Sequence, residues 1–106
     1  MDQICLVTTV VDARSVADLL AASAVAGRLA ACAQVGGPLD STYWWEGRVE
    51  TAQEWSVQFK TSADRVEALV DHVRAAHPYD VPEIIVTSVG SGNPAYQIWV
   101  YEQTRG

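Results

Sequence analysis

The chain has 106 residues, a formal net charge of −6 and 49% hydrophobic residues. That length suits a single domain, residues 1–106, built around one core. Its seven Lys and Arg residues are scattered, which argues against a nucleic-acid partner because affinity for phosphates depends on clustered positive charge. No apolar run approaches the roughly 20 residues that span a bilayer, so no membrane partner is expected.

The cysteines and the N-terminus bear on the compartment. Cys5 and Cys32 each lie within an apolar run, and neither has the CxxC spacing of a zinc or redox site. The chain begins with the acidic 1–3, and the apolar run 4–11 is too short for a signal peptide. These features predict a reduced, cytoplasmic protein.

The first part of the chain alternates between strand and helix patterns. The β-branched run 4–11 predicts a buried strand. Asp12 is a suitable N-cap for an amphipathic helix over about 13–28. The small apolar residues 29–35 then predict a second strand, which we expect to end at the Gly-Gly-Pro sequence 36–38.

An antiparallel hairpin is expected next. In the extended segment 41–49, alternation puts Tyr43 and Trp45 on one face and Trp44 on the other. A turn follows, and in the strand 54–60 apolar and polar residues alternate. The hairpin therefore has one buried face and carries large aromatic side chains.

The second half repeats the helix and strand patterns. The capping-box sequence 61–64 predicts a helix over about 62–76, and a strand is expected over 83–89. Asn93 as N-cap and Pro94 as first helical residue predict a short C-terminal helix. The element order gives an α+β fold, a ferredoxin-like βαββαβ sandwich with an antiparallel sheet and a short C-terminal helix.

The connector 77–83 holds the densest group of functional side chains. Its two prolines make it extended and rigid, and it carries His77, Tyr79, Asp80 and Glu83. His77 could bind a divalent cation, with a carboxylate completing the shell. It could equally cap the C-terminus of the preceding helix. Both interpretations are open at this point.

Two further residues, Cys32 and Lys60, are candidates for chemistry. Cys32 could ligate a soft metal such as Cu(I), although most unpaired cysteines are small buried hydrophobes. Lys60 and Glu83 lie at strand edges and could form a pair beside Tyr79, which would bind a small anion or act as an acid–base couple; structural ion pairs are commoner. A nucleophile with a paired base, a phosphate loop and an HExxH element are not found in the sequence, so an enzyme is not predicted.

Taken together, five motifs resemble the CutA family of divalent-cation tolerance proteins. In chain order they are Leu29-Ala30-Ala31-Cys32, Ser41-x-Tyr43-x-Trp45-x-Gly47 with Glu50, Glu54 with Lys60-Thr61, His77-Pro78-Tyr79-x-x-Pro82-Glu83-Ile84, and Gly92-Asn93-x-x-Tyr96-x-x-Trp99. The resemblance implies a homotrimer similar in architecture to PII signalling proteins. It also implies that copper or another divalent cation is weakly bound, in a role in metal tolerance.

Two functions follow from this resemblance. The first is metal binding with Cys32 and His77 as ligands. The alternative is a PII-like trimeric signalling protein or scaffold, whose clefts between subunits bind a small ligand or a partner protein through Lys60, Tyr79 and Glu83. A trimer is physically reasonable, because aromatic residues on both faces of long strands need a partner sheet.

Overall fold

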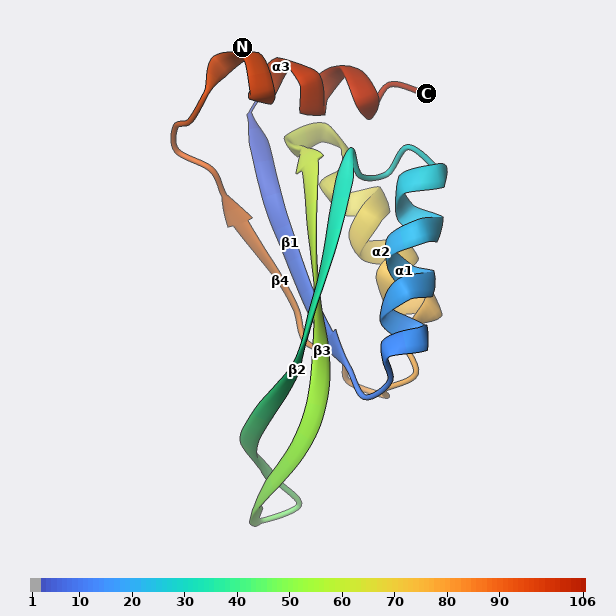
Figure 1. The fold of residues 1–106 in the computed structure, drawn as a ribbon, viewed down its shortest axis with the longest axis vertical. Helices are drawn as coiled ribbons and strands as arrows, with labels where there is room; N and C mark the ends of the chain where they lie inside the picture. The colour runs from blue at the N-terminus through green and yellow to red at the C-terminus, as the bar shows by residue number, and fades with distance from the viewer. Residues whose placement is uncertain (1–2) are drawn as a thin grey trace.

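The computed structural model describes residues 3–106. Its four strands form one antiparallel sheet in the order β2-β3-β1-β4, which confirms the predicted α+β sandwich (Figure 1). The elements are β1 (Ile4–Val11), α1 (Arg14–Ala26), β2 (Cys32–Trp45), β3 (Arg48–Ser62), a 3-10 turn (Ala63–Arg65), α2 (Val66–Ala76), β4 (Ile84–Ser88) and α3 (Pro94–Gln103).

Strand register divides the sheet into a core face and an open face. Val7 of β1 lies opposite Phe59 of β3, and Phe59 lies opposite Ala33 of β2. These side chains pack with α1 and α2 in the core, where Val7 and Phe59 are fully buried. The cross-strand neighbours Leu6, Lys60 and Cys32 lie on the opposite side of the sheet, because successive residues of a strand alternate between faces. We call this side the open face.

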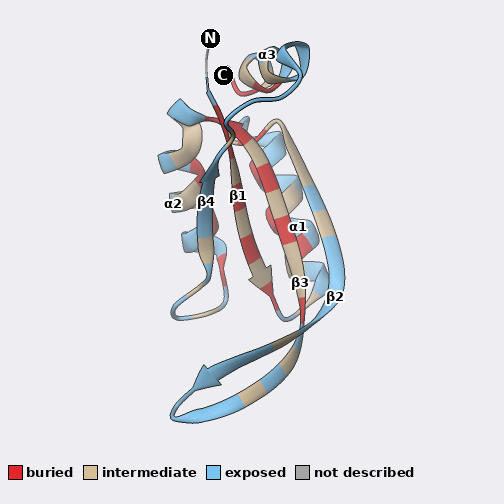
Figure 2. Ribbon diagram, turned by 90° about the vertical axis from the view of Figure 1, so that its left-hand side faces the viewer, coloured by how far each residue is buried: buried red, intermediate tan, exposed pale blue. Residues whose placement is uncertain are grey.

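The ribbon of β2 and β3 is longer and more continuous than predicted. The expected break at 36–38 is wrong: β2 runs on as far as Trp45, with a register shift between Gly36 and Leu39. A bulge bends a strand without ending its pairing, so hydrogen bonding to β3 overrides the local Gly-Pro signal. Beyond the helices the ribbon projects away from the sandwich, and its tip is largely exposed (Figures 1 and 2).

Helix starts were predicted with mixed success. Asn93 is the N-cap of α3 as expected, since its Oδ1 accepts the N–H of Ala95 at 3.1 Å. Asp12 was the wrong N-cap: α1 is preceded by Ala13, whose side chain cannot cap. The predicted capping box over 61–64 does not form. Thr61 donates to the Leu29 carbonyl at 2.7 Å, Ser62 donates to the Asp64 carboxylate at 2.6 Å, and α2 begins only at Val66.

No helix in residues 3–106 is both long enough and apolar enough to cross a bilayer.

Candidate functional site

His77 ends α2 and is held on both sides by the backbone. Its Nδ1 accepts the N–H of Tyr79 at 3.1 Å, so Nε2 carries the proton and donates to the carbonyl of Val10 at 2.9 Å. The ring is only 8% exposed and contacts Tyr79 edge to face, with ring centroids 4.7 Å apart. His77 therefore fastens the connector to the end of β1, and neither ring nitrogen is left for a ligand.

Tyr79 in turn reaches across to β3. Its hydroxyl donates to Glu54 Oε2 at 2.8 Å. Burial, and next the hydrogen bond to Glu54, raise the pKa of Tyr79 well above its usual range, so the phenol stays protonated and acts as a donor. Glu54 itself is only 7% exposed, which is unusual for a carboxylate. The connector thus meets the β2–β3 ribbon through a hydrogen bond to a buried carboxylate.

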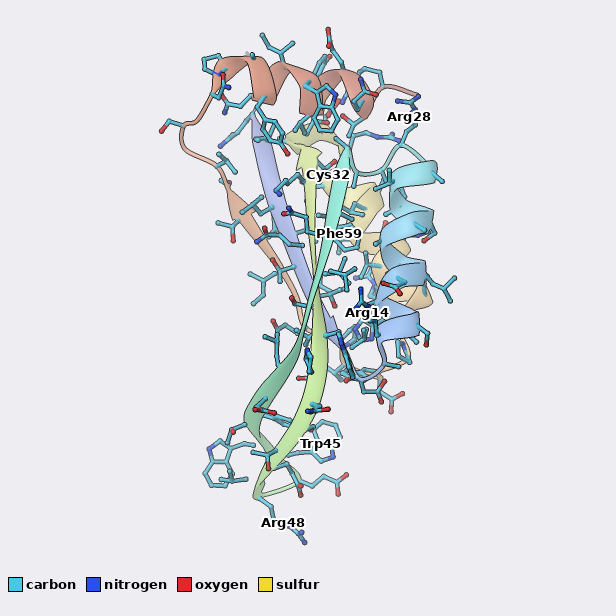
Figure 3. All side chains as sticks on the ribbon, viewed as in Figure 1. Arg14, Arg28, Cys32, Trp45, Arg48 and Phe59 are labelled. Atoms are coloured by element: carbon cyan, nitrogen blue, oxygen red, sulfur yellow. The ribbon has the colours of Figure 1, made fainter. Side chains whose placement is uncertain are left out.

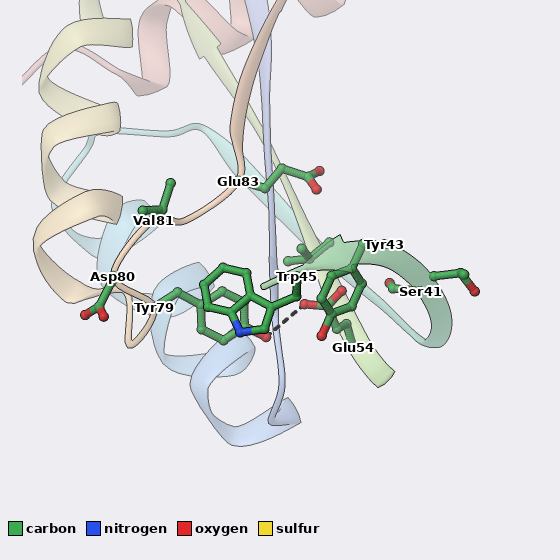
Figure 4. Close-up of a pocket in the computed structure, with 10 residues that line it drawn as sticks. Ser41, Tyr43, Trp45, Glu54, Tyr79, Asp80, Val81 and Glu83 are labelled. Atoms are coloured by element: carbon green, nitrogen blue, oxygen red, sulfur yellow. Dashed lines mark hydrogen bonds between the residues drawn. The ribbon is translucent and has the colours of Figure 1, made fainter. Parts of the chain in front are cut away.

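A hollow of about 620 Å³ opens beside this contact, between the ribbon and the connector (Figure 4). Three aromatic rings and three carboxylates line it, with no Lys, Arg or His among its described lining residues. We call it the aromatic hollow. Its lining residues are Val10, Ser41, Thr42, Tyr43, Trp45, Glu54, Tyr79, Asp80, Val81 and Glu83.

The residues predicted for a cleft are only partly brought together. Tyr79 and Glu83 both line the aromatic hollow, but Lys60 does not. On β1, Lys60 lies opposite Leu6, whereas Ile84, next to Glu83, lies opposite Thr9. Three residues of strand span about 10 Å, so the predicted Lys60–Glu83 pair is wrong. Lys60 instead donates to the side-chain amide oxygen of Gln34.

Cys32 lies at the start of β2, below α3 in Figure 3. It is half-buried, on the open face, and directly opposite Lys60. Burial, and next the charge interaction and the hydrogen bond with the nearby Cys32, raise the pKa of Tyr96 on α3. By contrast, Cys5 is buried, as predicted. Cys32 is therefore the more accessible of the two thiols.

The described residues of one chain do not form a complete metal site. Within residues 3–106, no three His, Cys, Asp or Glu side chains are close enough together to hold a metal ion. Cys32 and His77 also lie far apart. The His77 ring bonds the carbonyl of Val10, near one end of β1, whereas Cys32 lies opposite Lys60, which lies opposite Leu6 of β1. The part of a single chain that the structure describes does not fit a multidentate metal centre.

Sequence reasoning did not assign Glu54, Tyr43 and Trp45 to a ligand site. Glu54 alternates with the apolar residues of its strand, a pattern typical of a solvent-exposed side chain. It is buried because Tyr79, 25 residues further on, packs over it. The only sequence signal was the presence of all three residues in the family-like motifs.

Fold and site together define an α+β sandwich with an open sheet face, a projecting β-ribbon and a hollow beside its connector. Comparison with known proteins gives the family. The sequence-family model described as CutA1 divalent ion tolerance protein matches residues 5–103. The divalent-cation tolerance protein CutA of Thermus thermophilus is 38% identical over 104 residues, which cover 98% of this chain and 99% of the relative.

Other relatives and solved structures agree. The chloroplastic protein CutA 1 of Oryza sativa subsp. japonica is 42% identical over 86 residues, 81% of this chain and 49% of the relative. The crystal structure of CutA1 from Oryza sativa aligns with a TM-score of 0.94 at 36% identity, over 98% of this chain and 95% of that one. The chain belongs to the CutA1 divalent ion tolerance family. It spans about half the length of the rice and mouse relatives, at 49% and 50%.

The predicted cytoplasmic location is contradicted by these comparisons. The rice relative is named chloroplastic, and a matching structure from Archaeoglobus fulgidus, at 26% identity and a TM-score of 0.92, is described as the periplasmic divalent cation tolerance protein CutA. Members of the family are therefore found outside the cytoplasm. Unpaired cysteines and an acidic N-terminal sequence therefore do not determine the compartment of a protein of this family.

Proposed function

We propose that this protein contributes to metal tolerance as a homotrimer that binds copper or a similar divalent metal weakly. Membership of a family described by divalent ion tolerance supports the role in tolerance. The observation that carries the metal proposal is the half-buried Cys32 thiol on the open face. A thiolate is the protein ligand that best suits a soft ion such as Cu(I).

A trimer would also explain how one thiol per chain can form a site. One chain lacks a cluster of three ligands within its described residues, so a closed coordination shell would draw on several copies. A threefold assembly would present Cys32 in triplicate. The exposed apolar residues on β4 and on the ribbon, such as Ile85 at 54% and Trp44 at 74%, support association with further copies.

The test is a titration of Cu(I), and separately Hg(II), into the wild-type protein and Cys32→Ala. We expect the variant to lose about tenfold or more in affinity, because a thiolate–metal bond has no substitute at that position. Cys5→Ala is the matched control, since that thiol is buried in the core. Equal affinities in Cys32→Ala and wild type would contradict the proposal.

A second function is favoured by the aromatic hollow. We propose that a PII-like assembly of this chain binds a small ligand there, with Tyr79 and Glu83 among the contacts. The hollow of about 620 Å³ falls within the size range of small-molecule sites, and its apolar walls with a few polar groups are typical of them. A ligand that binds only the folded state raises the melting temperature, so a thermal-shift screen of metabolites tests this function.

A further inference from the structure

The chemistry of the aromatic hollow restricts its occupant. Its carboxylates are Glu54, Asp80 and Glu83, and its rings are those of Tyr43, Trp45 and Tyr79. The described lining holds no basic side chain, and the whole chain carries a net charge of −6. The electrostatic potential inside such a hollow is negative, so it attracts cations and repels anions.

Glu54 gives the hollow a directed acceptor. Its side chain is more than nine-tenths buried, at 7% exposure, and Oε2 accepts the Tyr79 hydroxyl at 2.8 Å. No described residue forms a hydrogen bond or an ion pair with Oε1, so this oxygen can accept from a ligand. A buried carboxylate is stabilised when a cationic donor reaches it.

The rings decide between a metal ion and an organic cation. Among residues 3–106, the carboxylates do not converge into a group of three that could hold a metal ion. Tyr43 and Trp45 are 42% and 54% exposed, so their rings are accessible to a ligand. The faces of Tyr and Trp rings attract ammonium and guanidinium groups, and their apolar surface suits an alkyl chain.

We infer that the aromatic hollow binds a small organic cation, an alkylammonium or alkylguanidinium, with its charged head at Glu54 and its apolar part against Tyr43, Trp45 and Tyr79. The inference deepens the second proposed function and rests on it, and it does not depend on metal binding at Cys32. The structure thus supplies a ligand class for this site.

Calorimetric titration of the full chain tests the inference with four probes that share a butyl chain: butylammonium, butylguanidinium, butanol and butyrate. We expect the two cations to bind, and the neutral and anionic probes to bind at least about tenfold more weakly. Glu54→Gln keeps an acceptor for Tyr79 but removes the charge, and it should weaken the binding of both cations by about tenfold or more. Glu67→Gln, an exposed carboxylate change on α2, is the matched control and should leave their affinity unchanged.

Trp45→Leu is a second variant. The Trp45 side chain is about half exposed, so its replacement should leave the fold intact. It should weaken cation binding by removing a ring face. Equal binding of butanol and butylammonium, or unchanged cation affinity in Glu54→Gln, would overturn the inference. Butyrate binding alone would overturn the cation class and leave a ligand-binding hollow in place.

Two further outcomes separate this inference from the function on which it rests. If none of the four probes bound and the metabolite screen also found no ligand, both would fail together. If Glu54→Gln lowered the oligomeric mass while no small cation bound to wild type, a basic side chain from a second copy would be the occupant. That result would overturn the inference of a free ligand.

Discussion

At the scale of single residues, His77 is a candidate metal ligand whose two ring nitrogens both form hydrogen bonds within the fold. One ring nitrogen accepts from Tyr79 and the other donates to Val10, 67 residues away in the sequence. Neither bond goes to a carbonyl of α2, so the ring does not cap that helix, and the metal role of His77 stays a prediction. The ring joins the end of α2 to the end of β1.

Replacing His77 by Ala should destabilise the fold by about 2 kcal/mol, because a partly buried carbonyl and a partly buried N–H lose their partners. Denaturant unfolding measures this loss. His72→Ala is the control: its ring bonds Ser23 at an exposed site, so the cost should stay below about 1 kcal/mol. We expect Cu(I) affinity to be unchanged in folded His77→Ala, and a weaker affinity would instead support His77 as a ligand.

Asp64 provides a pH-dependent test near the C-terminus. The guanidinium of Arg105 donates to both of its carboxylate oxygens, at 2.6 and 2.7 Å. Arg105 first, and Ser62 second, hold the pKa of Asp64 well below its usual range. Because the folded-state pKa lies below the unfolded one, the stabilisation is complete above the ordinary carboxyl range and is lost as the pH falls through the folded pKa.

Asp64→Asn should therefore lose about 1 kcal/mol near neutral pH, a value discounted for solvent screening because the side chain is 56% exposed. The gap to wild type should narrow as the pH falls below about 4. Urea unfolding over a pH series measures it. Asp71→Asn, which breaks an exposed pair with Arg74, should cost less than about 0.5 kcal/mol. A gap that stayed constant with pH would contradict the ionic origin.

At the scale of elements, the bulge in β2 sets the path of the ribbon that carries Tyr43 and Trp45 to the hollow. Gly37 has a φ of +136°, and a Cβ there would lie 2.9 Å from Trp55 Cδ1 and 3.1 Å from the Glu54 carbonyl oxygen. Only glycine fits this backbone and this contact without strain.

Gly37→Ala should destabilise the protein by about 2 kcal/mol or more, because it combines an unfavourable φ with a clash against the backbone of β3. Thermal unfolding measures the effect. Gly90→Ala has open space around the added methyl group and should change stability by less than about 0.5 kcal/mol. Equal melting temperatures for Gly37→Ala and wild type would show that the bulge can relax.

At the scale of the whole molecule, much apolar surface remains exposed in the single chain. Ile85 and Val86 on β4 are 54% and 44% exposed, and β4 is an edge strand of the sheet. Edge strands with apolar side chains associate readily unless they are covered. The proposed trimer would cover such edges.

Ile85→Lys should therefore reduce the oligomeric mass, which we expect to be three times the chain mass of 11.5 kDa in wild type. Sedimentation equilibrium measures it. Leu19→Lys is the matched control, since Leu19 is 69% exposed on α1 and away from the sheet edges. A monomeric wild-type protein, or a trimer unaffected by Ile85→Lys, would contradict this assignment of the interface.

The sequence by itself determined the elements whose signals are local. The bounds of β1 follow from one β-branched run, and the start of α3 follows from Asn93 and Pro94, since capping and propensity act within a few residues. The motif order also identified the family, which the comparisons confirm. The order of the elements was sufficient for the α+β sandwich with its antiparallel sheet.

Only the tertiary structure decided which side chains meet. Register along β1 separates Lys60 from Glu83, and packing of the connector on the ribbon brings Tyr79 to Glu54 and buries that carboxylate. Pairing with β3 carries β2 through its Gly-Pro sequence. These outcomes depend on contacts between residues that are far apart in the chain. The free energy of such contacts cannot be derived from local sequence patterns.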